Sequence, residues 1–190
     1  MSRLERYGVK IDSKDSNVQK ILDEVKDREF SGYSYDGADA SFELLANRLL
    51  GKVPQYLKVE SYNVIVSKSK EINTKANVTF LIDNKKIKCE GEGNGPVNAL
   101  DNAIRSNFKK VEKYYDYFSD LKLLDYKVRI LNTGTEATTR VLIESTDKSG
   151  ISWFTIGVSP NIIEASFKAL LDSLDYKLYK EEAPENFNEK

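Results

Sequence analysis

The chain has 190 residues, a formal net charge of −1 and no histidine. Its hydrophobic fraction of 40%, with 11 Tyr and 8 Phe, is enough for a folded core. The near-neutral charge provides no field to attract nucleic acid or an anionic membrane. No apolar run approaches the ~20 residues that cross a bilayer. We therefore expect neither nucleic acid nor a membrane as a partner.

The lack of histidine restricts the chemistry. It removes the commonest general base, the Ser-His and Cys-His nucleophile pairs, and the commonest zinc ligand. The composition therefore argues against catalysis by this chain alone, and we expect no catalytic residue, metal site or cofactor in it. Cys89 is the only cysteine, so no internal disulfide can form. With no signal peptide at its start, the chain is expected in the cytoplasm.

The first part of the chain, residues 1–56, has the pattern of two helices. Ser16 or Asn17 can cap the first, while Gly51 and Pro54 end the second. Two helices this short have too little apolar surface to stand alone, so we expect them to pack on another region. The apolar positions at helical spacing are Val18, Ile21, Leu22 and Val25 in the first helix, and Phe42, Leu45 and Leu49 in the second.

From Leu57 the apolar period changes from that of a helix to that of strands. Asp83-Asn84 predicts a hairpin turn, and 147–150 predicts a second. Proline at a helix start loses no hydrogen bond, which favours helices opening at Pro96 and Pro160. The helix that opens at Pro96 carries an apolar stripe as far as Val111, and Ser159 caps the helix that opens at Pro160. The expected strands are 57–67, 76–83, 85–92, 123–132, 137–145 and 151–158.

These segments form a duplication. Gly91–Ile104 and Gly157–Leu170 each run from a strand through a turn into a helix with alanines four residues apart. Upstream, Tyr62–Val66 resembles Tyr126–Ile130. We predict an α+β fold of two βββα units, with helices packed on one face of the sheets. The predicted domains are a helical linker subdomain, 1–56; a duplicated domain, 57–180, with repeats 57–113 and 121–178; and a flexible charged tail, 181–190.

Two motifs have competing interpretations. The turn 91–96 is glycine-rich, but its spacing matches neither common phosphate-binding loop, and Glu90 and Glu92 would repel phosphate. It is read instead as a tight strand-to-helix turn, or as a helix start that receives the carboxylate of a small ligand. The aromatic run 114–118 could stack on single-stranded nucleic acid, but without a basic groove a partly buried connector is favoured.

The motifs together resemble the C-terminal regulatory region of the isopropylmalate synthase and citramalate synthase family. The resemblance covers essentially the whole chain, and Gly32–Leu45 looks like the segment upstream of that region in citramalate-synthase-type members. The remaining segments that carry the resemblance are Gly91–Ala103, Leu124–Val128, Thr133–Ala137 and Ser159–Ala169.

The resemblance implies a regulatory role for a homodimer. Family members have a barrel that condenses acetyl-CoA with a 2-oxo acid at a divalent metal, and a duplicated βββα domain that dimerises and binds the end-product amino acid. This chain resembles only the linker and regulatory parts, so the metal is expected only in a catalytic barrel of the same protein. By position, the effector-binding residues would be Asn94, Val97, Leu123, Tyr126, Ile130, Ala137, Pro160 and Ile162.

In this pocket, apolar side chains would hold an aliphatic group, and amides at the two helix starts would hold its α-carboxylate. Asn94 or the region of Glu136 could meet the ammonium group. The alternative from the residues alone is that Leu123, Tyr126 and Ile130 are ordinary core. We predict a citramalate-synthase-like regulatory region that binds isoleucine as feedback inhibitor. The alternatives are an isopropylmalate synthase region that binds leucine, or a structural dimerisation module without a ligand.

Overall fold

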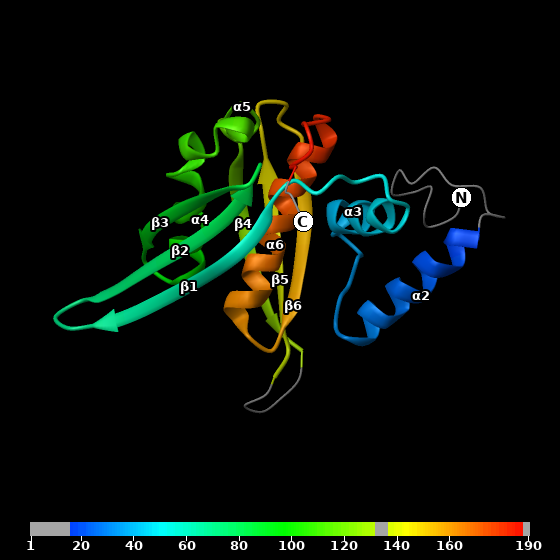
Figure 1. Cartoon of the computed structure of the whole chain (residues 1–190). Coiled ribbons are helices and arrows are strands. Elements are labelled where there is room, and N and C mark those ends of the chain that lie inside the picture. Colours follow the sequence, from blue (N-terminus) through cyan, green and yellow to red (C-terminus); the bar gives the residue numbers. More distant parts are fainter. Residues whose placement is uncertain (1–15, 132–136, 188–190) are drawn as a thin grey trace. The chain divides into compact units, whose positions relative to one another are not determined.

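The computed structural model describes residues 16–131 and 137–187 (Figure 1). It confirms the α+β class and the βββα duplication, with two three-stranded antiparallel sheets, each followed by a helix. None of the helices among these residues is long and apolar enough to span a membrane. The elements are α2 (Ser16–Phe30), α3 (Asp39–Leu49), β1 (Lys58–Lys68), β2 (Ile72–Ile82), β3 (Lys85–Gly93), α4 (Pro96–Arg105), η1 (Phe108–Lys110), η2 (Glu112–Tyr114), α5 (Tyr115–Phe118), β4 (Lys122–Ile130), β5 (Thr139–Thr146), β6 (Trp153–Ser159) and α6 (Ile162–Lys180).

The described residues form two compact units. The repeat-1 unit contains residues 55–121 and 177–187, and the repeat-2 unit contains residues 16–54, 122–131 and 137–176. Helix α6 lies mainly in the repeat-2 unit and contributes its last turn to the repeat-1 unit. The helices of the N-terminal segment thus belong to the same unit as the second repeat. The predicted boundaries of linker, regulatory domain and tail stay predictions.

In the repeat-1 unit, the strand order is β1-β2-β3, and α4 packs on one face of the sheet. Gly91 and Gly93 lie against α4, and a Cβ on Gly91 would stand 2.2 Å from the backbone nitrogen of Ala103. The small residues at this contact therefore let helix and sheet approach closely. Alternate residues of β2 are buried on the helix side, namely Thr74, Ala76, Val78, Phe80 and Ile82.

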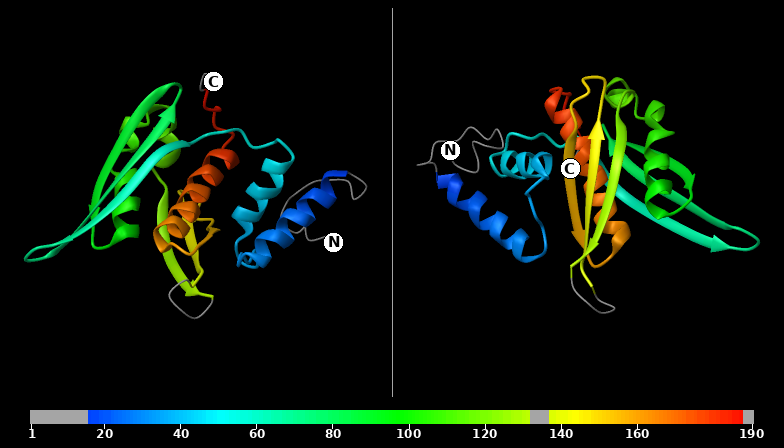
Figure 2. Two further views of the ribbon diagram at one scale, coloured as in Figure 1. Left: turned by 60° about the horizontal axis from the view of Figure 1, so that its bottom comes forward. Right: turned by 180° about the vertical axis from the view of Figure 1, so that it is seen from behind.

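In the repeat-2 unit, the order is β4-β5-β6, and α6 lies along one face of the sheet (Figures 1 and 2). A Cβ on Gly157 would stand 1.9 Å from the carbonyl oxygen of Ala165, which repeats the contact of the first unit. Each first strand also has a register shift, between Val59 and Ser61 in β1 and between Leu123 and Asp125 in β4. The duplication therefore extends to the irregularities of the backbone.

Helices α2 and α3 pack on the second repeat, which confirms the expectation that they need a partner surface. Strand β6 has Thr155 and Gly157 facing α6, so Ile156 and Val158 point to the opposite face. That face is covered by the helices. The buried members of the shared cluster are Ile21, Val25, Tyr35, Ala38, Phe42, Leu45, Ala46, Ile156 and Val158.

Several boundaries differ from the sequence predictions, and three of the differences have a visible cause. Strand β2 begins at Ile72 rather than Ala76, because the facing end of β1 continues to pair with it. Helix α4 ends at Arg105, although Phe108 and Val111 of its predicted stripe are still buried, Phe108 in the 3₁₀ turn η1 and Val111 between η1 and η2. The Asn107 side chain donates to the carbonyl oxygens of Ala103 and Glu90, and this competes with continued helix.

A further difference is at the start of α6, which begins at Ile162 rather than at Pro160. The Asn161 side chain accepts hydrogen bonds from the amides of Ile163, at 2.8 Å, and Glu164, at 3.3 Å. Asn161 rather than Ser159 therefore caps the helix. Both predicted hairpin turns are confirmed, with positive φ at Asp83, Asn84 and Gly150.

The aromatic connector is partly buried, as favoured from the sequence. The side chains of Tyr114 and Phe118 are within the core, whereas Tyr115 is 36% exposed. Tyr114 packs edge-on against Tyr56, with ring centroids 6.3 Å apart. Cys89 is buried too, and burial raises the pKa of its thiol to about 11, so it is protonated at neutral pH.

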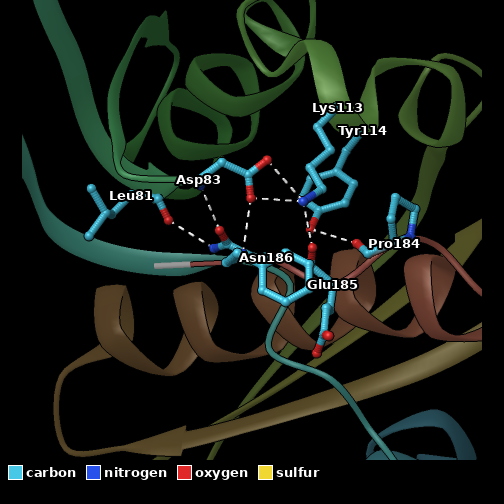
Figure 3. Close-up of polar contacts among 8 residues, drawn as sticks. Leu81, Asp83, Lys113, Tyr114, Pro184, Glu185 and Asn186 are labelled. Carbon is cyan, nitrogen blue, oxygen red and sulfur yellow. Dashed lines mark hydrogen bonds and ion pairs between the residues drawn. The ribbon is translucent and has the colours of Figure 1, made fainter. Parts of the chain in front are cut away.

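The segment that follows α6 binds back to its own unit, although its composition indicated a loose tail. We call residues 183–187 the C-terminal strap (Figure 3). The side chain of Asn186 donates to the carbonyl oxygen of Leu81 and accepts from the amide of Asp83. Lys113 contacts Asp83 and the carbonyl oxygen of Glu185. The strap therefore holds the turn between β2 and β3.

Candidate functional site

Strand β4 carries the first three residues of the predicted effector wall. Leu123 and Tyr126 are half-buried, but the Ile130 side chain is 71% exposed. The interpretation of all three as ordinary core is therefore wrong for Ile130. Because Tyr126 and Ile130 are an even number of residues apart in a regular stretch of strand, they lie on the same face of the sheet.

The hydroxyl of Tyr126 ties this face of β4 to the first turn of α6. Ser166 donates to the carbonyl oxygen of Ile162 at 2.6 Å, and the Tyr126 hydroxyl lies 3.0 Å from the Ser166 hydroxyl. Because the Ser166 proton is already used, Tyr126 is the donor of this bond. Burial raises the pKa of Tyr126, so the phenol stays protonated in this contact.

An exposed apolar surface lies beside that contact. Val128 is between Tyr126 and Ile130 on the same face of β4, and Ile162 is one helical turn before Ser166. The exposed fractions are 37% for Val128, 71% for Ile130 and 45% for Ile162. We call these three residues the β4–α6 strip. The alternation of β4 could have identified Val128 from the sequence, although it was not among the predicted site residues.

The remaining predicted residues of this unit flank the strip along the chain. Pro160 is exposed in the loop between β6 and α6, and Ala137 is half-buried just before β5. Residues 132–136, which include Glu136, lie outside the described residues. The structure thus places Leu123, Tyr126, Ile130 and Ile162 around one face of β4 and the first turn of α6.

The polar groups at the α6 start are already engaged. Besides the two amides capped by Asn161, the Ser159 hydroxyl accepts from the Asn161 amide and donates to Glu164 at 2.6 Å. The hydrogen bond from Ser159, together with Lys168, lowers the pKa of Glu164. A ligand carboxylate at this helix start would therefore compete with Asn161 for the same amides.

The other two predicted residues belong to the repeat-1 unit. Asn94 is exposed and Val97 half-buried, at the start of α4. Within the described chain no side chain caps α4, whose N-cap residue is Gly95. A hollow of about 670 Å³ adjoins this start and includes Asn94 in its lining, with Asn98, Asn102 and the turn between β1 and β2. It is polar, unlike the apolar pocket predicted for an aliphatic side chain.

The first repeat has its own exposed apolar strip on β1 and β2. Tyr62 and Val66 occupy the strand positions that correspond to Tyr126 and Ile130. Their exposed fractions are 36% and 56%, and Ile72 at the start of β2 is 65% exposed. Contiguous apolar residues on a surface commonly mark contacts with another molecule.

A second hollow, of about 610 Å³, lies within the repeat-2 unit between α2, α3 and α6. Its lining includes charged residues from each helix, among them Arg28, Arg48 and Asp172. Sequence reasoning did not single out these residues, because the contacts between α3 and α6 join positions far apart in the chain.

The chain resembles proteins of known function over most of its length. Residues 36–178 match the family described as the LeuA allosteric (dimerisation) domain. A (R)-citramalate synthase of Geobacter sulfurreducens is 46% identical over 96% of this chain and 35% of its own length. A (R)-citramalate synthase of Aquifex aeolicus is 42% identical over 95% of this chain and 34% of its own length.

A 2-isopropylmalate synthase of Burkholderia multivorans is also similar, with 30% identity over 91% of this chain and 31% of its own length. The chain spans about a third of the length of these curated relatives. The family match covers α3, both sheets, α4 and most of α6. The chain therefore belongs to the LeuA allosteric (dimerisation) domain family.

Proposed function

We propose that this chain is the regulatory region of a (R)-citramalate synthase-like enzyme, and that it dimerises and binds isoleucine as a feedback inhibitor. The relatives named (R)-citramalate synthase reach 46% identity, against 30% for the Burkholderia multivorans 2-isopropylmalate synthase, which supports the citramalate type. In such a protein, acetyl-CoA and pyruvate would be condensed in a separate catalytic barrel, with this chain acting on it from outside.

The observation that carries the proposal is the exposed β4–α6 strip. Apolar surface gains roughly 25 cal/mol for each Å² removed from water, so an aliphatic side chain seated on Val128, Ile130 and Ile162 would be held by burial. Leu123 and Tyr126 extend the same face inward, and the Tyr126–Ser166 bond fixes the ring. Because these side chains are branched, they leave a narrow space for the ligand, which favours a β-branched amino acid such as isoleucine.

Dimerisation is supported by the family description and by exposed apolar surface in both repeats. A second copy would remove Tyr62, Val66 and Ile72 from water, and it would cover the β4–α6 strip together with the ligand seated there. Sedimentation equilibrium of the chain should give twice the monomer mass. A monomer at high concentration would contradict this part of the proposal.

Titration calorimetry tests the effector. We expect isoleucine to bind more tightly than leucine, and a leucine preference above tenfold, about 1.4 kcal/mol, would reverse the assignment toward the 2-isopropylmalate synthase type. If neither amino acid binds to a dimeric chain, the alternative of a structural dimerisation module is supported instead. Support for this alternative comes from the first repeat, because its apolar strip on β1 and β2 is exposed to a similar extent as the β4–α6 strip.

A pair of matched variants locates the site. Ile130→Ser removes the most exposed apolar side chain of the strip, and Val66→Ser makes the same kind of change at the corresponding position of β1. Both changes are at exposed positions, so the folded state should tolerate them. We expect Ile130→Ser to weaken isoleucine binding at least about tenfold and Val66→Ser to leave it within about threefold. Equal effects would contradict a site on the second repeat.

A further inference from the structure

One hydroxyl group connects three elements of the repeat-2 unit. Ser41 of α3 is 3% exposed and accepts a hydrogen bond from the backbone amide of Ile156, on β6, at 3.0 Å. The same hydroxyl donates to the carboxylate of Asp172, on α6, at 2.7 Å. Because β6 is an edge strand, Ser41 satisfies an amide that no neighbouring strand could reach.

Charged side chains surround this hydroxyl. The guanidinium of Arg48, two turns along α3, donates to Asp172 at 2.8 Å and to Asp175 at 2.7 Å. The two carboxylates are mostly shielded, with side chains 20% and 17% exposed. Hydrogen bonds between charged groups are shorter and stronger than neutral ones, and they are directional. We call Ser41, Arg48, Asp172, Asp175 and the Ile156 amide the Ser41 joint.

The joint responds to the distance between β6 and α6. These elements follow one another in the chain and are separated only by Pro160 and Asn161. If α6 slides or turns relative to β6, the Ser41 hydroxyl must give up either Ile156 or Asp172, or move with one of them. Close packing favours discrete alternatives over gradual strain. A displacement of α6 would therefore be passed to α3.

The proposed effector residues lie at the beginning of the same helix. Ile162 is the first residue of α6, and Asp172 lies ten positions further, at about 15 Å along the axis. An uninterrupted helix transmits movement over this length because its backbone hydrogen bonds keep it rigid. The hollow of about 610 Å³ between α2, α3 and α6 leaves space for the side chains of the joint to rearrange.

We propose that the Ser41 joint couples ligand occupancy at the start of α6 to the position of α3, so that α2 and α3 move when a ligand binds to the second repeat. This inference rests on the proposed function, because it requires a ligand at the β4–α6 strip. The residues of the Ser41 joint are positioning residues. They do not touch the ligand, but they determine whether its binding changes the position of α3. By linkage, a ligand that shifts the position of α3 must bind with different affinities to the protein in its two α3 positions.

Hydrogen exchange on this chain, with and without saturating isoleucine, tests the coupling. Three variants are compared with the wild type. Ser41→Ala and Asp172→Asn break the joint, whereas Ser145→Ala is the matched control, because it removes a buried hydroxyl bond between β5 and α6, at 2.7 Å to Ser173, without touching α3. Calorimetry measures isoleucine binding in each protein, and leucine replaces isoleucine if it is the tighter ligand.

In the wild type we expect ligand to change the exchange rates of the α3 amides by at least about threefold. Ser145→Ala should retain this change, whereas Ser41→Ala and Asp172→Asn should lose it while binding isoleucine within about threefold of the wild type. If Ser41→Ala does not fold, Asp172→Asn, which preserves shape, decides the result.

Several outcomes would overturn the coupling. Ligand could bind the wild type without affecting α3, the response could persist in both joint variants, or the folded joint variants could fail to bind. A wild type that binds neither amino acid is a different result. It removes the proposed effector function itself, and calorimetry alone identifies it.

Discussion

The two repeats share one plan but differ in what supports it. Both have a register shift in the first strand and a glycine pressed against the following helix, Gly91 on α4 and Gly157 on α6. Outside this common core, the second sheet is covered at β6 by an apolar cluster from α2 and α3. The turn between β2 and β3 is instead held by the polar C-terminal strap (Figure 3).

This difference shows that the duplicated sequence determines the core of each repeat, while its surroundings determine its role. A repeat packed against α2 and α3 can move them. A repeat whose turn is held by the Asn186 side chain of a strap has no such connection among the described residues of its own unit. The second repeat is therefore the better candidate for sending a signal.

The largest effect is expected from the apolar support of the second repeat. Phe42 is 2% exposed and packs edge-on against Tyr35, with ring centroids 5.6 Å apart. Phe42→Ala should lower the free energy of unfolding by about 3–5 kcal/mol through lost burial and an unfilled cavity. Denaturant titration measures this loss, and hydrogen exchange should place it in α2, α3 and β6.

Leu49→Ala on the same helix is the control, because Leu49 is 40% exposed and its loss should change stability by no more than about 1 kcal/mol. If Phe42→Ala increases exchange equally in β2 and β3, the two repeats do not differ in their support.

A somewhat smaller effect should be common to both repeats. A Cβ at Gly157 or Gly91 would overlap backbone atoms of the facing helix, at 1.9 Å and 2.2 Å. Gly157→Ala and Gly91→Ala should therefore each cost about 2–3 kcal/mol, because helix and sheet must separate. Thermal unfolding measures both.

Gly95→Ala is the matched control, because a Cβ there meets nothing within 4 Å and its φ of −168° suits any residue. A loss in only one of the two core variants would show that the helix-to-sheet contact is not shared.

The polar support of the first repeat should contribute less. Asn186→Ala leaves the carbonyl oxygen of Leu81 and the amide of Asp83 without this partner. The expected loss is about 1–3 kcal/mol, the usual range for buried groups that lose a hydrogen bond. Exchange should rise at the turn between β2 and β3 and remain unchanged in α3. Asn77→Ala, which removes an exposed amide bond to Asn63, is the control and should have little effect.

Features with strong local signals were predictable from the sequence. Asp83-Asn84 needs positive φ at both positions, which asparagine and aspartate tolerate, and Pro96 begins α4 as expected. The ends of helices and strands that depend on residues distant in the chain were not predictable from the sequence. Asn107 ends α4 by reaching a carbonyl oxygen of β3, and the partners of Asn186 are backbone groups far back in the chain. A side chain's bond to a remote backbone group leaves no pattern in its neighbours.

The candidate site also has features that the sequence predicts and features that it does not. The family resemblance predicted Leu123, Tyr126 and Ile130 as one wall of the site. Strand alternation places Tyr126 and Ile130 on one face of β4, whereas Leu123 joins that face through the register shift between Leu123 and Asp125, which the sequence did not predict. The exposure of Ile130 could not be predicted, since it depends on where the covering helix α6 begins. The Ser41 joint was also beyond the sequence, because Ser41 and Asp172 meet only when α3 packs against α6.

The smallest effect concerns acid sensitivity of the strap. The hydrogen bond from Lys113, followed by that from the Phe187 amide, lowers the pKa of Asp83 below its ordinary value of 3.8. A carboxylate whose pKa is lower in the folded state stabilises the fold above its unfolded-state pKa, and this contribution is lost as the pH falls through the folded-state pKa. The strap should thus stay bound at neutral pH and loosen only below pH 3.8.

The Phe187 amide is the direct reporter, because it donates to Asp83 at 3.0 Å. Its chemical shift, followed from about pH 6 to about pH 2, should titrate with a midpoint below the ordinary aspartate value. Asp83→Asn should abolish this titration at Phe187 without changing the shifts of α3, since an amide keeps the shape but not the charge. The carboxylate is exposed, so added salt should move the midpoint up toward the ordinary value. A midpoint at or above that value in low salt would mean that Lys113 does not hold Asp83 in solution.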